Sequence, residues 1–185
     1  PEFPLERRAR FETEYGLSAY DADILTSERG LSEYFENAVA GFVGEAKVVS
    51  NWMINDLSRL MNDLGKTASE LVLTPKFLAQ IIGMVEEGKI NAATGKSLLR
   101  KVEESGREPA RIVEEEGLAV IADSSALRQQ IESVLAASPA EVESFRAGKE
   151  SLLGWFVGQV MRATGGKADP KRTREILLDL LGQKS

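Results

Sequence analysis

The sequence contains neither cysteine nor histidine. Without cysteine, disulfides and thiolate metal sites are excluded, and the composition is typical of the reducing cytoplasm, where we expect this chain. Without histidine, it lacks the side chain most often used for acid–base catalysis near neutral pH, which is also the commonest metal ligand. We therefore expect neither a catalytic residue nor a metal site in these 185 residues.

Long hydrophobic runs are also missing. No apolar stretch approaches the roughly 20 residues of a membrane-spanning helix, and no signal peptide opens the sequence. We expect no membrane partner. The chain begins at Pro1 rather than methionine, so we expect a piece of a longer protein. The first residues could be a cloning remnant or the end of a linker, and the predicted fold begins at residue 4.

Helix signals recur along the whole chain, and no strand pattern is convincing. Apolar residues at three- and four-residue spacing predict one helix over 46–64. Thr74 before Pro75, and Asn91 further on, are typical helix caps. The sequence therefore predicts an all-α fold, with a helical bundle at 4–116 and a small tail domain of three or four short helices at 117–185.

The tail contains three predicted helices with clear boundaries. Ser138 to Glu141 reads as a capping box with proline at the first helical position. Residues 149–163 form a strongly apolar helix, and the last helix runs from Pro170 to Gly182. Gly154 and Gly158 lie opposite the apolar face of 149–163. They indicate close approach of a neighbour, either a binding partner or another helix of the same domain.

Two motifs that suggest ligand sites are better explained by helix structure. Residues 88–97 resemble a phosphate-binding loop, but Ile90 stands where the motif needs glycine, and Lys96 falls inside a helix. We interpret this segment as a helix junction. Residues 114–116 are three consecutive glutamates, which point in different directions on a helix and so predict a solvated face rather than a metal site.

Charge is distributed unevenly, with −8 over residues 1–124 and +2 over residues 125–185. The last helix opens with Lys171, Arg172 and Arg174, although the amino end of a helix favours acidic residues. Lys167 lies in the loop before it. This arrangement indicates a contact with phosphate, made with help from free backbone N–H groups. The other interpretation is an ordinary basic surface.

Several segments resemble the GatB/YqeY family, which includes the B subunits of aspartyl/glutamyl-tRNA amidotransferases. In the tail the resemblance is carried by Gly148-Lys149, Gly154, Val157-Gly158-Gln159-Val160-Met161-Arg162, Thr164, Gly166-Lys167-Ala168 and Pro170. Upstream it is carried by 6–11, 15–17, 20–22, 34–36, 51–52, 88–90, 112–115 and 117–118. Many relatives have lysine where this chain has Arg162, which keeps the charge but changes the hydrogen-bonding geometry.

The resemblance implies a division of labour. In this family an upstream domain holds ATP and Mg²⁺, activates the carboxylate of mischarged Glu-tRNA(Gln) or Asp-tRNA(Asn), and amidates it with ammonia from a glutaminase subunit. The present chain would be non-catalytic and without a cofactor, with tRNA and the other amidotransferase subunits as partners. We expect RNA contacts from Lys149, Arg162, Lys167, Lys171, Arg172 and Arg174. The alternative is a protein–protein docking module without direct RNA contact.

Overall fold

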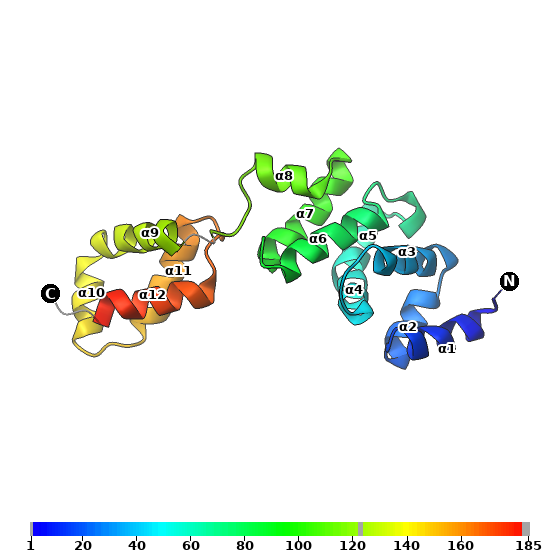
Figure 1. The fold of residues 1–185 in the computed structure, drawn as a ribbon, viewed down its shortest axis with the longest axis horizontal. Coiled ribbons are helices and arrows are strands. Elements are labelled where there is room, and N and C mark those ends of the chain that lie inside the picture. The colour runs from blue at the N-terminus through cyan, green and yellow to red at the C-terminus, as the bar shows by residue number, and fades with distance from the viewer. Residues whose placement is uncertain (1, 122–123, 183–185) are drawn as a thin grey trace. The chain divides into compact units, whose positions relative to one another are not determined.

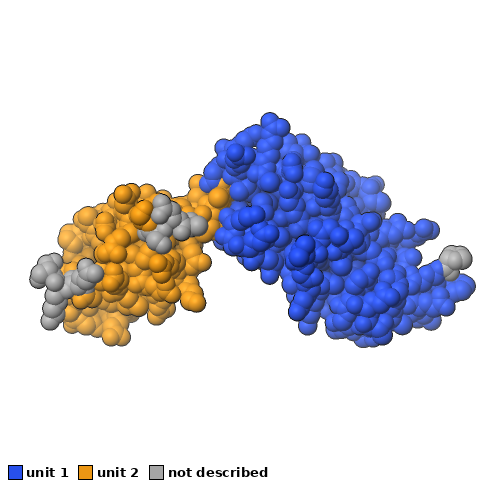
Figure 2. Space-filling view, in the orientation of Figure 1, with its two compact units in different colours: residues 1–117 blue, residues 118–185 orange. Residues whose placement is uncertain are grey.

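The computed structural model describes residues 2–121 and 124–182. All regular elements in these ranges are helical, which confirms the all-α prediction (Figure 1). The chain divides into two compact units, Pro1–Gly117 and Leu118–Ser185, coloured separately in Figure 2. Each unit is described by itself below.

Unit 1 packs its helices around Phe11, Phe35, Leu57 and Ile81, which are buried. Its elements are α1 (Pro4–Glu14), α2 (Ala19–Thr26), α3 (Arg29–Ala40), α4 (Ala46–Trp52), the π-helix η1 (Met53–Leu57), α5 (Ser58–Leu64), the 3-10 turn η2 (Ala68–Glu70), α6 (Pro75–Glu86), α7 (Ala92–Ser105) and α8 (Pro109–Glu115). Helix α6 contacts α3, α4, α7 and α8 and is therefore the centre of the unit.

The predicted caps of α6 and α7 are confirmed. The Thr74 hydroxyl accepts a hydrogen bond from the N–H of Phe77 at 3.2 Å. The Asn91 side chain accepts one from the N–H of Thr94 at 2.8 Å. Each cap satisfies one backbone donor that the first helical turn leaves open.

The helix predicted over 46–64 is present but contains a π-helical turn. Regular α-helix runs through α4, changes to the π-helix η1 at Met53–Leu57, and resumes as α5 up to the left-handed Gly65. The Ser58 hydroxyl donates to the carbonyl of Met53, five residues back, at 2.9 Å. One extra residue in the turn shifts the helix faces, and both Met53 and Leu57 stay in the core.

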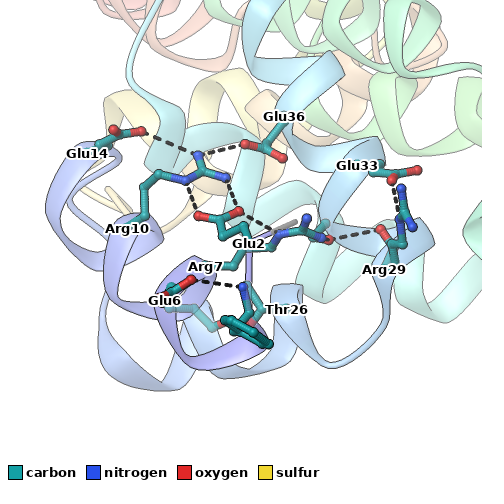
Figure 3. A network of polar contacts seen from close by, with 12 residues as sticks. Glu2, Glu6, Arg7, Arg10, Glu14, Thr26, Arg29, Glu33 and Glu36 are labelled. Carbon is teal, nitrogen blue, oxygen red and sulfur yellow. Dashed lines mark hydrogen bonds and ion pairs between the residues drawn. The ribbon is translucent and has the colours of Figure 1, made fainter.

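Residues 2 and 3, which lie before the predicted start of the helical domain, make contacts with α1, whose first residue is Pro4. The carboxylate of Glu2 receives hydrogen bonds from Arg7 at 3.0 Å and Arg10 at 2.7 Å (Figure 3). These two bonds lower the pKa of Glu2 to about 2. Arg10 also pairs with Glu36 of α3 at 2.7 Å, so the ion network ties the amino end of α1 to α3.

Unit 2 is built from α9 (Ser124–Ala136), α10 (Pro139–Arg146), α11 (Leu152–Ala163) and α12 (Pro170–Gly182). Its buried core consists of Leu127, Ile131, Leu153, Phe156, Val160, Ala168, Ile176, Leu177 and Leu181. Two details differ from the prediction. Helix α11 starts at Leu152 because residues 149–151 form a turn, and Ser138 makes no capping hydrogen bond with its side chain although Pro139 does start α10.

Limited proteolysis is expected to cut between Glu116 and Val120 and to leave a stable carboxyl-terminal piece. Helix α8 ends at Glu115, and the N–H of Ile121 already bonds to the carbonyl of Lys167 in unit 2 at 3.0 Å. The short segment between these points belongs to no helix and is largely exposed, so a protease can reach its backbone. Mass spectrometry of the fragments tests this. A single resistant core without a cut in this window contradicts independent units.

Candidate nucleic-acid interface

The six predicted RNA-binding residues all lie in unit 2, on or beside α11 and α12. Arg162 lies in the last turn of α11, Lys167 lies in the following loop, and Lys171, Arg172 and Arg174 lie in the first two turns of α12. These five residues follow one another around the end where α11 passes into α12. Lys149 lies at the opposite end of α11, which is about 18 Å long at 1.5 Å per residue.

Most of these cations have no anionic partner within the described residues. Lys149, Arg162, Lys167, Lys171 and Arg174 form no ion pair there. Arg172 differs, because its guanidinium pairs with Glu175 one turn later at 2.8 Å. Five cations of the set are therefore available to an external anion. The sixth, Arg172, would have to contact an external anion while it is paired with Glu175.

The cations of unit 1 are mostly held in ion pairs. Paired side chains in its described part are Arg7, Arg8, Arg10, Arg29, Lys66, Lys89, Lys96, Arg100, Lys101, Arg107 and Arg111. The exceptions are Lys47, Arg59 and Lys76, which are dispersed over α4, α5 and α6. Available positive charge is thus concentrated in unit 2, at the junction of α11 and α12.

The amino end of α12 is less open to an anion than its cations suggest. The Asp169 carboxylate already accepts a hydrogen bond from the N–H of Arg172 at 2.7 Å. The N–H of Thr173 bonds to the carbonyl of Asp169 at 2.8 Å, and Pro170 has no N–H. The N–H groups of Arg172 and Thr173 are therefore already used within the helix. A phosphate contact here would therefore be made mainly by side chains.

The glycines of α11 do not pack against another helix of the described chain. A Cβ added at Gly154 or at Gly158 would meet no atom within 4 Å. Of the two explanations left open by the sequence, packing within the domain is therefore excluded for the described residues. Beside these glycines the indole of Trp155 is exposed, a feature that the apolar periodicity of the helix did not reveal.

A buried carboxylate in unit 1 has a perturbed pKa and a structural role. The Glu103 side chain is 2% exposed and pairs with Lys66 at 2.6 Å. It also accepts the N–H of Leu73 at 2.8 Å, and the carbonyl of Leu73 receives the hydroxyl of Tyr34 at 2.7 Å. Burial alone would raise the pKa of Glu103, but the hydrogen bonds of Leu73, Lys66 and Val72 lower it. The cluster fixes the loop before α6 to α7.

The segment that resembles a phosphate-binding loop has no room for a phosphate at its second glycine. Gly95, the second glycine of the segment that resembles a phosphate-binding loop, is buried inside α7. A Cβ there would lie 2.7 Å from Val85 and 2.9 Å from Trp52, so α7 packs too closely for a phosphate to enter. Within residues 2–121 and 124–182, no group of three acidic side chains could hold a metal. No helix in those ranges meets the length and hydropathy of a membrane span.

Comparison with known proteins decides the family. The GatB domain model matches residues 33–181, which is most of the chain and includes parts of both units. The chain belongs to the GatB/YqeY family. The tail residues that suggested this resemblance therefore lie within the family match. In unit 1 the match extends from within α3 to α8.

Three relatives of this family are B subunits of aspartyl/glutamyl-tRNA(Asn/Gln) amidotransferases. The Solidesulfovibrio magneticus protein is 46% identical over 182 residues, or 98% of this chain. Those of Myxococcus xanthus and Rippkaea orientalis are 43% and 42% identical, over 98% and 96% of the chain. The chain spans only 36% to 38% of the length of these relatives.

Proposed function

We propose that this chain is the tRNA-binding and docking part of a tRNA-dependent amidotransferase that works in the cytoplasm. The complete enzyme would convert mischarged Glu-tRNA(Gln) or Asp-tRNA(Asn) to Gln-tRNA or Asn-tRNA. The names of the relatives support the general role. The observation that carries the RNA contact is the set of partner-free cations around the junction of α11 and α12, in contrast to the paired cations of unit 1.

In this proposal the cations bind and orient the substrate and take no part in the chemistry. Lys167, Lys171 and Arg174 attract phosphates as charged donors, and Arg162 can offer two parallel N–H groups to one phosphate. ATP, Mg²⁺ and the reacting carboxylate would be held by the part of the protein outside this chain. Such binding is equally strong in the ground state and the transition state, so losing it in the whole enzyme raises KM for the charged tRNA and leaves kcat unchanged.

Unit 1 offers the features expected for docking onto protein subunits. Its sequence is acidic, and it exposes large apolar side chains at Phe3, Leu5, Tyr20 and Val43. Scattered apolar side chains are common on protein surfaces, but an acidic surface repels RNA and tolerates a basic protein partner. We therefore assign RNA contact to unit 2 and subunit contact to unit 1. Docking without any RNA contact is the competing outcome of the following experiment.

Binding of the 185-residue chain to tRNA is expected to be weak and strongly dependent on salt. With about 3 to 5 phosphates neutralised, a plot of log affinity against log salt concentration has a slope of roughly −2 to −5. Filter binding or fluorescence anisotropy between about 50 and 200 mM salt measures this slope. A slope near zero with measurable affinity, or no binding at the lowest salt, favours a purely protein-docking function.

A further inference from the structure

The outer face of α11 combines an exposed tryptophan with a partner-free arginine. Trp155 is 39% exposed, whereas Trp52, the other tryptophan of the chain, is 8% exposed in the core of unit 1. The indole contacts the buried Phe156 edge-to-face, with ring centroids 5.2 Å apart. The indole is therefore held by its contact with Phe156 while part of its surface stays open to solvent.

Trp155, Gly158 and Arg162 form one row along this face. Their spacing of three and four residues places them above one another on an α-helix, with Trp155 and Arg162 about 10 Å apart along the axis. Gly158 leaves a gap between the two larger side chains, because a Cβ there would meet nothing. The row thus presents an aromatic surface, a hollow and a cation in sequence.

The charge of the face favours an anionic partner. Arg162 is the one charged residue of α11, Lys149 precedes the helix and Lys167 follows it, and none of these three has an ion-pair partner in the described chain. Arg162 also borders a pocket between the end of α9 and α11, lined by Val134, Ala137, Ser138, Gln159, Arg162 and Ala163. A hydrophobic protein segment would have to bury this guanidinium without a partner, which is costly.

We propose that this face binds an unpaired nucleotide of the RNA, with the base stacked on Trp155, the sugar over Gly158 and a phosphate on Arg162. The proposal rests on the tRNA-binding function proposed above and identifies which part of the RNA contacts α11. A base inside a double helix already stacks on its neighbours, whereas a base in a loop presents a free ring face. The axial rise of about 10 Å between Trp155 and Arg162 is on the scale of a base and a phosphate of the same or the adjacent nucleotide.

Tryptophan fluorescence tests the stacking directly on the whole chain. Adding a tRNA transcript is expected to quench the emission of the parent chain. In the variant Trp155→Phe the remaining emission comes from the buried Trp52 and is expected to stay unchanged. Trp155→Ala is expected to weaken tRNA binding roughly 5- to 20-fold, and Trp155→Phe much less, because phenylalanine retains an aromatic surface for stacking. A hairpin with an unpaired loop is expected to reproduce the quench, unlike a blunt RNA duplex with the same number of phosphates.

A second pair of variants separates binding from folding. Gly158→Ala is expected to raise the melting temperature of unit 2, since alanine is the better helix former and the methyl group meets no neighbour. The same methyl fills the hollow and is expected to weaken tRNA binding about 3- to 10-fold, within the range of a lost stacking contact. Gly83→Ala in α6 is the matched control, because that helical glycine also has no atom near an added Cβ. It should stabilise unit 1 and leave binding unchanged.

The outcomes distinguish this inference from the function on which it rests. If the parent chain does not bind tRNA at all, the proposed function is wrong. If it binds with the expected salt dependence but both the hairpin and the duplex leave Trp155 emission unchanged, only the α11 contact is wrong. Equal binding by the parent chain, Trp155→Ala and Gly158→Ala likewise contradicts the α11 contact alone.

Discussion

Replacing Lys171 and Arg174 together by glutamate is expected to weaken tRNA binding roughly 10- to 50-fold at about 0.1 M salt. Both side chains are exposed and without an ion-pair partner in the described chain, and they lie one turn apart on the same face of α12. The change removes two phosphate contacts and adds two repulsive charges. The slope of log affinity against log salt concentration is expected to become less steep by about two, one for each lost phosphate contact.

The same double change is expected to leave unit 2 folded and slightly more stable. The first two turns of α12 lie at the positive end of the helix dipole, where glutamate is favoured over lysine or arginine by up to about 1 kcal/mol. Weaker binding therefore cannot result from unfolding. Thermal unfolding followed by circular dichroism measures the stability, and anisotropy with labelled tRNA measures the affinity.

The chain offers a closely matched control for this experiment. Lys76 occupies the second position of α6, directly after Pro75, as Lys171 does in α12 after Pro170. It too is without an ion-pair partner within the described residues. Lys76→Glu is expected to stabilise α6 equally and to leave tRNA binding unchanged. If this variant weakens binding as much as the double variant does, the location of the interface in unit 2 is wrong.

Replacing Glu103 by alanine is expected to destabilise unit 1 by about 3 kcal/mol. The carboxylate is buried, and its removal leaves the N–H of Leu73 without an acceptor and Lys66 without its counter-charge. Lys66 is partly exposed to water, which limits the loss on its side. Urea unfolding of the variant measures the change, and Glu104→Ala, at the exposed neighbouring position, is expected to lie within about 0.5 kcal/mol of the parent chain.

The contribution of Glu103 also depends on pH. Because the pKa of Glu103 in the fold lies below the ordinary value of 4.5, the unfolded chain binds its proton more readily. The stabilisation is therefore fully present above about pH 4.5 and is lost as the pH falls through the pKa of the folded state. Below that pH the difference in stability between the parent chain and Glu103→Ala is expected to become smaller, because the ionic part of the contribution is lost. A constant difference down to strong acid contradicts the ionic contribution.

The sequence predicted those parts of the fold that depend on local signals. Thr74 and Asn91 mark helix starts through contacts within one turn, and the structure shows them as predicted. The apolar face of α11 was likewise predicted from its spacing, since burial of one face sets the period.

The features that the sequence did not reveal depend on contacts between distant residues. The role of Glu2 depends on arginines of the next helix and on Glu36 of α3. The π-helical turn of η1 arises within a continuous apolar pattern that an α-helix would also satisfy. Whether a cation is paired depends on which carboxylates the fold brings near it, and this decides which of the basic residues are available to RNA.

Chemical acetylation of lysines with and without tRNA tests the central claim most directly, because it reports the contact surface residue by residue. The interface proposed here predicts that tRNA protects Lys149, Lys167 and Lys171 of unit 2 from acetylation at low salt. Lys47 and Lys76 of unit 1, which also have no ion-pair partner in the described chain, are expected to react equally in both samples. An RNA interface at the junction of α11 and α12 is contradicted if tRNA protects the unit 1 lysines while Lys167 and Lys171 stay fully reactive in the bound chain.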